Sequence, residues 1–340
     1  MKKAVITGER QSGVVDAPDP VARENWVVLK VHASPMCTEY KGFMAGRPSV
    51  SLGHEAAGEV VEVAQPGRVA VGDRVVAMPQ YPCGTCALCV SGEYIHCQES
   101  VNFSEFTGEG EGRATMAQMM LKPDWILPPI PDDISYDHAS MACCGLGPTF
   151  GAQERMDVHP GEILMITGLG PVGLGGVVNG SDRNARVIAV DTNEWRRKKA
   201  LDLGAEVAFS PDQALEGIRD LTSGLGVDAA VDCSGAPAAH RLGIDGVRRR
   251  GRVAFVGECS EDTVIRISPD MIRKGITLHG SWHYNLSLFP RLMGAVRRNP
   301  DKLETLISHR FDMANVQDAF ELQTSGECAK VLLRPWGLDA

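Results

Sequence analysis

The sequence lacks long apolar runs, internal repeats and an excess of positive charge. A bilayer span needs about 20 consecutive apolar residues, and no stretch of this 340-residue chain approaches that length. We therefore expect no membrane anchor. Lys and Arg number 34 against 43 Asp and Glu, for a net charge of -9. This balance argues against a nucleic-acid partner, because phosphate binding requires a basic face.

The sequence also shows no secretory leader. Lys2 and Lys3 precede an apolar run that covers only Ala4–Ile6, which is shorter than the apolar core of a signal peptide. We therefore expect a cytoplasmic protein, whose thiols are kept reduced. A chain of 340 residues is long enough for two domains, each with its own core.

Four of the ten cysteines are concentrated in one short stretch with the spacing C-x2-C-x2-C-x7-C. They are Cys83, Cys86, Cys89 and Cys97. In a reduced environment this spacing favours metal over disulfides. Four thiolates complete the tetrahedral coordination of Zn²⁺ and leave no position for a substrate. The pattern predicts a structural zinc lobe, and it directs attention to a second, open metal site elsewhere.

The sequence pattern changes near residue 140. Before it, short β-like runs are broken by Gly and Pro, as in 26–33, 56–63 and 72–79. After it, apolar strands alternate with helical segments, which implies a doubly wound parallel sheet and an α/β fold. The strands expected there are 163–166, 186–193, 206–210, 227–236 and 251–258, and the expected helices include 139–156 and 194–204.

Two further segments complete the expected organisation. The tail from residue 285 contains two helical stretches followed by a strand at 329–336. The basic run Arg248–Arg250 is interpreted as a solvated helix end and not as a nucleic-acid patch.

A G-x-G-x-x-G motif follows the apolar strand 163–166 and opens a helical segment. Its residues are Gly168, Gly170, Pro171, Val172 and Gly173. In this context the glycines permit a tight turn and close backbone approach, and the helix N-terminus presents free N–H groups to a pyrophosphate. The motif therefore predicts a dinucleotide site, although an ordinary βα turn is the alternative.

Asp191 ends the next expected strand, at the place of the ribose-binding acid of the motif. A carboxylate there accepts both ribose hydroxyls and repels a 2′-phosphate, so we expect NAD in preference to NADP. Arg196, Arg197 and Lys198 follow closely, and a cation nearby can accommodate that phosphate. We interpret these three as a solvated helix face.

The order of these features resembles the zinc-dependent medium-chain dehydrogenase/reductase superfamily, which includes the alcohol and polyol dehydrogenases. The resemblance covers nearly the whole chain. It depends most on the cysteine lobe, on Gly53-His54-Glu55 with Gly58, and on the dinucleotide motif. It implies a GroES-like catalytic domain at 1–140 and 285–340 and a Rossmann domain at 141–284.

The resemblance also implies a catalytic zinc site. Its ligands would be Cys37, His54 and a third residue that precedes the glycine motif. Cys144 fits the third position by its local pattern, and Cys143 is one residue away and stays open. Three protein ligands leave a fourth position for a substrate oxygen or water. Glu55, beside His54, is implied as an acid that approaches the metal transiently.

The segment after Cys37 departs from the family pattern. Members carry Cys-x-Ser/Thr-Asp, whereas this chain has Cys37-Thr38-Glu39. Either Glu39 stands at the hydroxyl position, or one residue is missing and Thr38-Glu39 replaces Ser/Thr-Asp. We favour Thr38 as the hydroxyl that passes the substrate proton. Glu39 as a direct base is the alternative.

Two further groups of residues are candidates. By resemblance, the backbone near Val256 and Gly257 faces the nicotinamide. Trp282, His283 and Tyr284 could line the substrate site, form a subunit contact, or simply pack at a strand end.

The resemblance implies a dehydrogenase with two zinc ions and NAD. Its substrate would be a secondary alcohol, which we expect to be a polyol, sugar or cyclitol. L-threonine 3-dehydrogenase and a simple-alcohol dehydrogenase are alternatives within the class. A non-catalytic NAD-binding zinc protein and a nucleic-acid-binding zinc module are alternatives of other classes. We expect a homo-oligomer, either a tetramer or a dimer.

Overall fold

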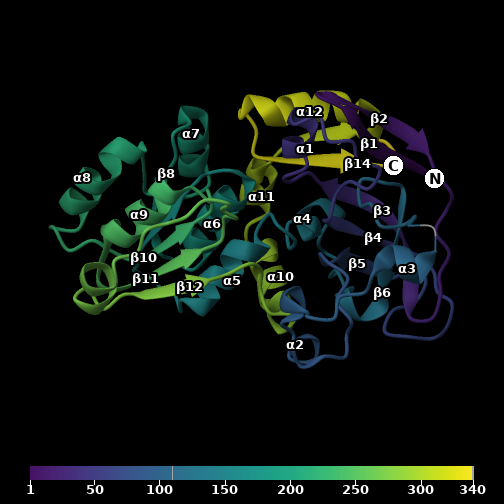
Figure 1. The fold of residues 1–340 in the computed structure, drawn as a ribbon, viewed down its shortest axis with the longest axis horizontal. Helices are drawn as coiled ribbons and strands as arrows, with labels where there is room; N and C mark the ends of the chain where they lie inside the picture. The colour runs from purple at the N-terminus through teal and green to yellow at the C-terminus, as the bar shows by residue number, and fades with distance from the viewer. Residues whose placement is uncertain (109, 339–340) are drawn as a thin grey trace. The chain divides into compact units, whose positions relative to one another are not determined.

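The structure is a computed structural model, and it describes residues 1–108 and 110–338 (Figure 1). Two compact units form in it. The first contains residues 1–145, residues 285–297 and the segment from Ile307 to the end of the described chain. The second contains residues 146–284 and 298–306.

The first unit is built on a six-stranded sheet. Its strands are β3 (Trp26–Pro35), β4 (Ala56–Glu62), β5 (Arg74–Ala77), β6 (Met119–Pro123), β13 (Ile307–Asp312) and β14 (Lys330–Arg334). The order along the sheet is β13-β14-β3-β4-β5, and β6 also pairs with β3. A separate antiparallel pair is formed by β1 (Lys2–Gly8) and β2 (Gln11–Asp16).

Short helices fill the connections of the first unit. They are α1 (Tyr40–Met44), α2 (Ala87–Val90), α3 (Phe103–Thr107), α4 (Tyr136–Ser140), α10 (Phe289–Arg298) and α12 (Val316–Ser325). The 3₁₀ turns are η1 (Tyr94–His96), η2 (Asp124–Ile126), η4 (Leu286–Leu288) and η5 (Met313–Asn315).

Strand β3 shows how alternation builds this core. Val27, Leu29 and Val31 pack into one apolar cluster, whereas Trp26 and Val28 pack into another. Successive side chains of a strand point to opposite faces of its sheet. Because both faces of β3 are covered, its first four residues are all apolar and buried.

The second unit is a parallel sheet with helical crossovers. Its strands are β7 (Ile163–Thr167), β8 (Arg186–Val190), β9 (Val207–Phe209), β10 (Val227–Asp232), β11 (Val247–Phe255) and β12 (Thr277–Gly280). The order is β12-β11-β10-β7-β8-β9. The chain reverses its direction of winding between β7 and β10, as in a dinucleotide-binding sheet. The expected doubly wound sheet is therefore confirmed.

The helices of the second unit follow the strands. They are α5 (Gly147–Arg155), α6 (Pro171–Asp182), α7 (Glu194–Asp202), α8 (Pro211–Leu221), α9 (Pro237–Gly246) and α11 (Pro300–Leu306), with one π-helical segment, η3 (Ile267–Ile272). Helix α6 packs on β7 and β8, and α9 packs on β10 and β11 (Figure 1).

Three local expectations differ from the structure. Arg248–Arg250 lie within strand β11 and do not end a helix, because they form the irregularity between Val247 and Arg252, which both pair with β10. The helix expected at 139–156 is interrupted by turns at 141–146, where Cys143 and Cys144 lie. The segment 298–306 groups with the second unit, where Arg298 and Asn299 bind Asp182.

Within the described residues, no helix combines the length and apolar character needed to cross a membrane.

Candidate active site

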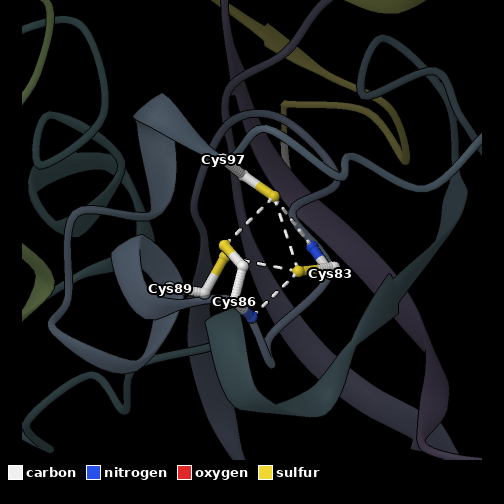
Figure 2. Close-up of side chains that lie close together, drawn as sticks. All are labelled: Cys83, Cys86, Cys89 and Cys97. Carbon is white, nitrogen blue, oxygen red and sulfur yellow. Dashed lines mark hydrogen bonds between the residues drawn. The ribbon is translucent and has the colours of Figure 1, made fainter.

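The four cysteines of the lobe converge around one point (Figure 2). Their sulfur atoms all lie within 4.8 Å of one another. The Sγ atoms of Cys83 and Cys97 are 3.6 Å apart, and those of Cys86 and Cys97 are 3.9 Å apart. All ten cysteines belong to the described chain, and all are free thiols. The lobe therefore offers four sulfur ligands at a spacing that suits one metal ion.

The backbone of the lobe also favours thiolates. The N–H groups of Cys83 and Cys86 each donate to a neighbouring cysteine sulfur at 3.3 Å. Burial acts to raise the pKa of Cys83, but donors from Thr85 and Cys86 lower it to about 6. The thiolate is the form that binds metal.

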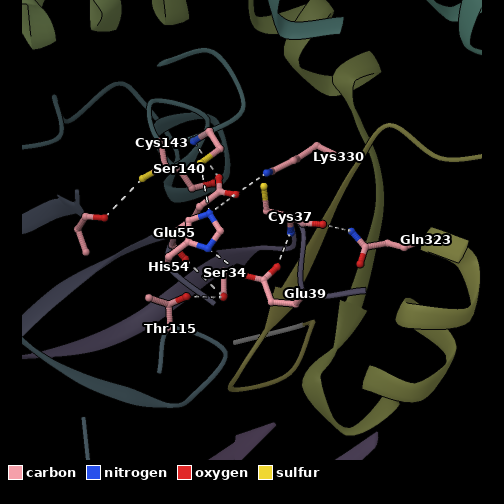
Figure 3. Close-up of polar contacts among 12 residues, drawn as sticks. Ser34, Cys37, Glu39, His54, Glu55, Thr115, Ser140, Cys143, Gln323 and Lys330 are labelled. Atoms are coloured by element: carbon pink, nitrogen blue, oxygen red, sulfur yellow. Dashed lines mark hydrogen bonds and ion pairs between the residues drawn. The ribbon is translucent and has the colours of Figure 1, made fainter. Parts of the chain in front are cut away.

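A second cluster of candidate ligand side chains lies in the same unit and consists of Cys37, His54, Glu55 and Cys144. Figure 3 shows Cys37, His54 and Glu55 of this cluster. One ligand atom from each lies within 4.8 Å of the others, and Cys144 Sγ is 3.3 Å from His54 Nε2. Cys37 follows β3, His54 and Glu55 precede β4, and Cys144 lies in the turn between α4 and α5. Only folding brings these three segments together.

Cys143 lies outside this cluster. Its side chain is buried, and its thiol donates to the carbonyl oxygen of Ala77 at 3.5 Å. Burial raises the pKa of Cys143 to about 12. The structure thus brings Cys144, and not Cys143, to Cys37 and His54.

The cluster favours a thiolate at Cys37. A hydrogen bond with Cys144 lowers the pKa of Cys37 well below its ordinary value, with Lys330 and His54 acting in the same direction against burial. The Cys37 sulfur in turn raises the pKa of Cys144. Two thiols that share one proton respond in this coupled way. Thiolate and imidazole are the ligands that zinc prefers, so this set of residues fits zinc.

Both oxygens of Glu39 are engaged with candidate ligand residues. Oε1 lies 2.9 Å from His54 Nδ1, and Oε2 accepts a hydrogen bond from the backbone N–H of Cys37 at 2.9 Å. A carboxylate in this position orients the imidazole of a metal ligand. The side chain of Thr38 is exposed beside Cys37.

Residues that the sequence reasoning missed complete the surroundings of the cluster. Lys330 Nζ donates to Glu55 Oε1 at 2.6 Å, and Glu55 Oε2 accepts from the backbone N–H of Cys144 at 3.0 Å. Gln323 donates to the carbonyl oxygen of Cys37 at 3.4 Å. A single lysine inside the apolar strand 329–336 was the available signal, but its partner is known only from the fold.

The glycine motif has the geometry of a close-approach turn. Gly168 has φ +79°, and a Cβ on it would lie 2.6 Å from the nitrogen of Ser234. A Cβ on Gly173 would lie 1.9 Å from the oxygen of Gly168. Gly170 immediately precedes α6, and a Cβ there would meet no described atom within 4 Å. The turn thus leaves open space at the N-terminus of α6, which begins with Pro171 and Val172 and suits a pyrophosphate.

Asp191 directly follows β8 and closes this turn. Its Oδ2 accepts from the N–H of Leu169 at 2.6 Å, and its Oδ1 accepts from the N–H of Asn193 at 2.7 Å. Arg197 donates to the carbonyl oxygens of Asp191 and Thr192 at 2.8 and 2.9 Å. Lys198 pairs with Glu194. Of the three cations that follow Asp191, Arg197 is therefore engaged at the end of β8 and Lys198 is engaged within α7.

The remaining candidates also lie in the second unit. Val256 and Gly257 donate their N–H groups to the carbonyl oxygen of Asp232 at 2.9 and 3.0 Å. Tyr284 is buried and packs edge-on against Phe150 of α5. The other two aromatic candidates differ in exposure, since His283 is buried and Trp282 is 43% exposed.

Comparison with known proteins gives matches over most of the chain. Residues 23–132 match a family model described as alcohol dehydrogenase GroES-like domain, and residues 171–298 match one described as zinc-binding dehydrogenase. The chain is 28% identical to sorbitol dehydrogenase of Halalkalibacterium halodurans, with 98% of this chain and 99% of the relative covered. It is 30% identical to L-threonine 3-dehydrogenase of Pyrococcus horikoshii, with 94% and 93% covered. Among solved structures, alcohol dehydrogenase TADH from Thermus sp. ATN1 matches with a TM-score of 0.89 at 23% identity, with 98% and 99% covered.

Proposed function

We propose that this chain, which belongs to the zinc-dependent medium-chain dehydrogenase/reductase superfamily, moves a hydride between a secondary alcohol and NAD. The predicted family is confirmed, and so is the predicted combination of a GroES-like domain with a Rossmann domain. The chain is thus an oxidoreductase of the alcohol and polyol dehydrogenase type. The convergence of Cys37, His54 and Cys144 in one half-buried cluster carries the proposal.

We assign Cys37, His54 and Cys144 as the residues that would hold a catalytic zinc. The four cysteines of the lobe would hold a second, structural zinc. Zinc held by three protein ligands has an open fourth position, where it would polarise a substrate oxygen and lower the pKa of the substrate hydroxyl. Glu55 lies within 4.8 Å of the three candidate ligand atoms but is engaged by Lys330 and by the N–H of Cys144.

The proton released from the alcohol is assigned to Thr38. Its side chain is exposed beside Cys37, whereas both oxygens of Glu39 are already engaged with Cys37 and His54. We therefore assign Glu39 to the orientation of His54. This arrangement favours the interpretation that one residue is missing after Cys37 and that Thr38-Glu39 replaces Ser/Thr-Asp.

NAD is the proposed cofactor, and when bound it supplies the nicotinamide that accepts the hydride. The open space at Gly170 and the start of α6 would take its pyrophosphate. Asp191, at the end of β8, would accept its ribose hydroxyls. Arg197 is engaged with the carbonyl oxygens of Asp191 and Thr192, and Lys198 is engaged with Glu194, which supports NAD over NADP.

A polyol, sugar or cyclitol is the proposed substrate class. Sorbitol dehydrogenase from H. halodurans aligns over nearly the full length of this chain, which supports the choice. L-threonine is the second candidate, because a 30% identical relative is an L-threonine 3-dehydrogenase. Simple alcohols form the third group to be tested.

A homo-oligomer is also proposed. Strand β12 lies at an edge of its sheet, and Ile267, Ile272 and Trp282 are exposed nearby in sequence. Unpaired edges and exposed apolar side chains are features that a second copy can cover. Light scattering on the purified chain would test this, and a monomer would contradict it.

The test is NADH formation from a panel of polyols, cyclitols, L-threonine and simple alcohols, with NADP measured in parallel. Cys144→Ser should abolish the activity and remove one zinc while NAD still binds. Cys143→Ser is the matched control, because it changes the adjacent thiol that points to Ala77. Equal losses from the two variants would contradict the assignment of Cys144, and a zinc-loaded chain that is silent on the whole panel would contradict the proposed substrate classes.

A further inference from the structure

Asp232 lies between the two turns that we assign to cofactor binding. It is the last residue of β10, which lies between β7 and β11 in the sheet. The glycine turn follows β7, and the turn of Val256 and Gly257 follows β11. Asp232 is only 2% exposed, although it is charged. A buried carboxylate at this place requires several polar partners.

The carboxylate of Asp232 holds the end of β7 and the turn that follows β10. Oδ1 accepts from the hydroxyl groups of Thr167 at 3.0 Å and Ser234 at 2.7 Å, and also from the N–H of Ser234 at 3.2 Å. Oδ2 accepts from the N–H of Gly235 at 3.0 Å. The side chain thus ties Thr167, which immediately precedes Gly168, to residues 234–235.

The three turns are packed against one another without spare room. A Cβ on Gly257 would lie 2.3 Å from the nitrogen of Gly235, and a Cβ on Gly235 would lie 2.1 Å from the oxygen of Glu258. A Cβ on Gly168 would lie 2.6 Å from the nitrogen of Ser234. A displacement of residues 234–235 is therefore transmitted to the turns on both sides.

His240 supports Asp232 from helix α9. Its Nε2 is 3.2 Å from Asp232 Oδ2, and its Nδ1 is 2.6 Å from the hydroxyl oxygen of Thr263. Nε2 is buried and makes no aligned hydrogen bond within the described chain, so His240 meets the Asp232 carboxylate by close contact alone. The ring also packs edge-on against Phe255, the last residue of β11. His240 thus limits the movement of the Asp232 carboxylate.

The two cofactor turns differ in their other anchors. The glycine turn is also fixed to β8, because Gly168 donates to Val190 and Leu169 donates to Asp191. The N–H groups of Val256 and Gly257 both donate to the carbonyl oxygen of Asp232. The turn after β11 is therefore fixed by the main-chain carbonyl of Asp232 and by its close packing on Gly235, whose N–H the Asp232 carboxylate binds.

We propose that Asp232, held by His240, is a positioning residue that fixes the turn of Val256 and Gly257 against the glycine turn, and so sets the fit of the nicotinamide half of NAD. This inference rests on the proposed binding of NAD. It predicts that a change at Asp232 weakens the binding of whole NAD more than the binding of ADP-ribose, which lacks the nicotinamide.

The experiment is calorimetric titration of the zinc-loaded chain with NAD and with ADP-ribose. Asp232→Asn should raise the Kd for NAD about tenfold or more, a loss of about 1.4 kcal/mol, and the Kd for ADP-ribose by no more than about threefold. Ser234→Ala, which removes one hydroxyl donor, should change the ratio of the two Kd values in the same direction by about two- to fourfold. This milder variant keeps the test decisive if Asp232→Asn does not fold.

Asp228→Asn is the matched control, because it removes a carboxylate from the opposite end of the same strand. Asp228 binds Arg248 and the N–H of Ile163 and touches neither cofactor turn. It should leave both Kd values within about twofold. If Asp232→Asn weakens the binding of NAD and of ADP-ribose equally, or weakens neither, the inference is wrong while the proposed function stands. Wild-type chain that binds neither ligand would overturn the proposed function and the inference with it.

Discussion

Glu55 and Lys330 form a 2.6 Å ion pair in which neither side chain is exposed to solvent. The pair joins the residue after His54 to strand β14, across 275 positions of sequence. Burial raises the pKa of Glu55 to about 7, with Lys330 acting against it. Burial lowers the pKa of Lys330, but the charge of Glu55 raises it above its ordinary value. Glu55 therefore keeps Lys330 protonated, and Lys330 opposes the loss of charge that burial favours at Glu55, at a place that water does not reach.

Lys330→Met should destabilise the protein. We expect a loss of about 3–5 kcal/mol in the free energy of unfolding, because Glu55 then remains as an unpaired buried charge. Urea denaturation of the zinc-loaded protein measures it. The double variant Glu55→Gln/Lys330→Met should recover a large part of the loss, since no charge is left unpaired. If the double variant is as unstable as the single one, packing and not charge explains the effect.

Thr38 and Glu39 should have separable effects. Thr38→Val should lower kcat by about 10²–10⁴-fold while the zinc content stays unchanged, because it removes only the proton-transferring hydroxyl. Glu39→Gln should instead weaken zinc binding by about 10–100-fold, because His54 loses its orienting carboxylate. Steady-state kinetics and a zinc-chelator competition measure the two effects. An active Thr38→Val enzyme would restore Glu39 as the candidate base.

Loss of a lobe cysteine should remove one zinc and leave the other. Cys97→Ser is expected to lower the zinc content from two ions to one per chain and to lower the thermal unfolding temperature, because a structural zinc contributes folding free energy directly. Metal analysis and calorimetry measure both. Ser100→Ala is the control, because it changes a neighbouring exposed side chain that donates to the carbonyl oxygen of Cys97 but offers no sulfur to the lobe. An unchanged zinc content in Cys97→Ser would contradict the structural zinc site.

Lys122 should make stability rise with pH above neutrality. Its ammonium is buried against the carbonyl oxygen of Gln80, and burial lowers its pKa to about 7. An unfolded lysine has a pKa of about 10.4, so between these values the unfolded chain binds the extra proton. Stability therefore increases with pH in this window and is lowest below pH about 7.

The variant Lys122→Met removes this titration. From pH 7 to pH 9 the wild type should gain about 1–2 kcal/mol of unfolding free energy relative to the variant, measured by urea denaturation at each pH. Lys122 Nζ also lies 4.1 Å from the ring centre of Tyr81. If the difference in unfolding free energy between the wild type and the variant does not change with pH, this cation–π contact keeps Lys122 protonated.

The sequence by itself predicts those elements whose residues lie close together along the chain. Cys83, Cys86, Cys89 and Cys97 lie within 15 consecutive positions, so the local chain can bring their sulfurs together. The glycine turn is equally local, since an apolar strand, a turn and a helix follow one another directly. Alternation of strands and helices then leads to the parallel sheet.

The candidate catalytic cluster depended on family resemblance, because its ligands are far apart in sequence. Cys37, His54 and Cys144 come from three segments, and no periodicity relates them. The choice between Cys143 and Cys144 was decided by the turn at 141–146, which sends one thiol to Ala77 and the other to His54. The two neighbouring cysteines have the same chemistry, so only the direction of each side chain distinguishes them.

The partners of buried charges were decided by the tertiary structure alone. Lys330 was visible in the sequence as a cation in an apolar strand, and Asp232 as an acid inside the expected strand 227–236. Neither pattern names Glu55 or His240, because a charge removed from water takes whichever partner the fold places beside it. The sequence by itself determined the family, the lobe and the dinucleotide motif. The packing of distant segments decided which charged groups meet, because side-chain direction and burial exist only once the chain has folded.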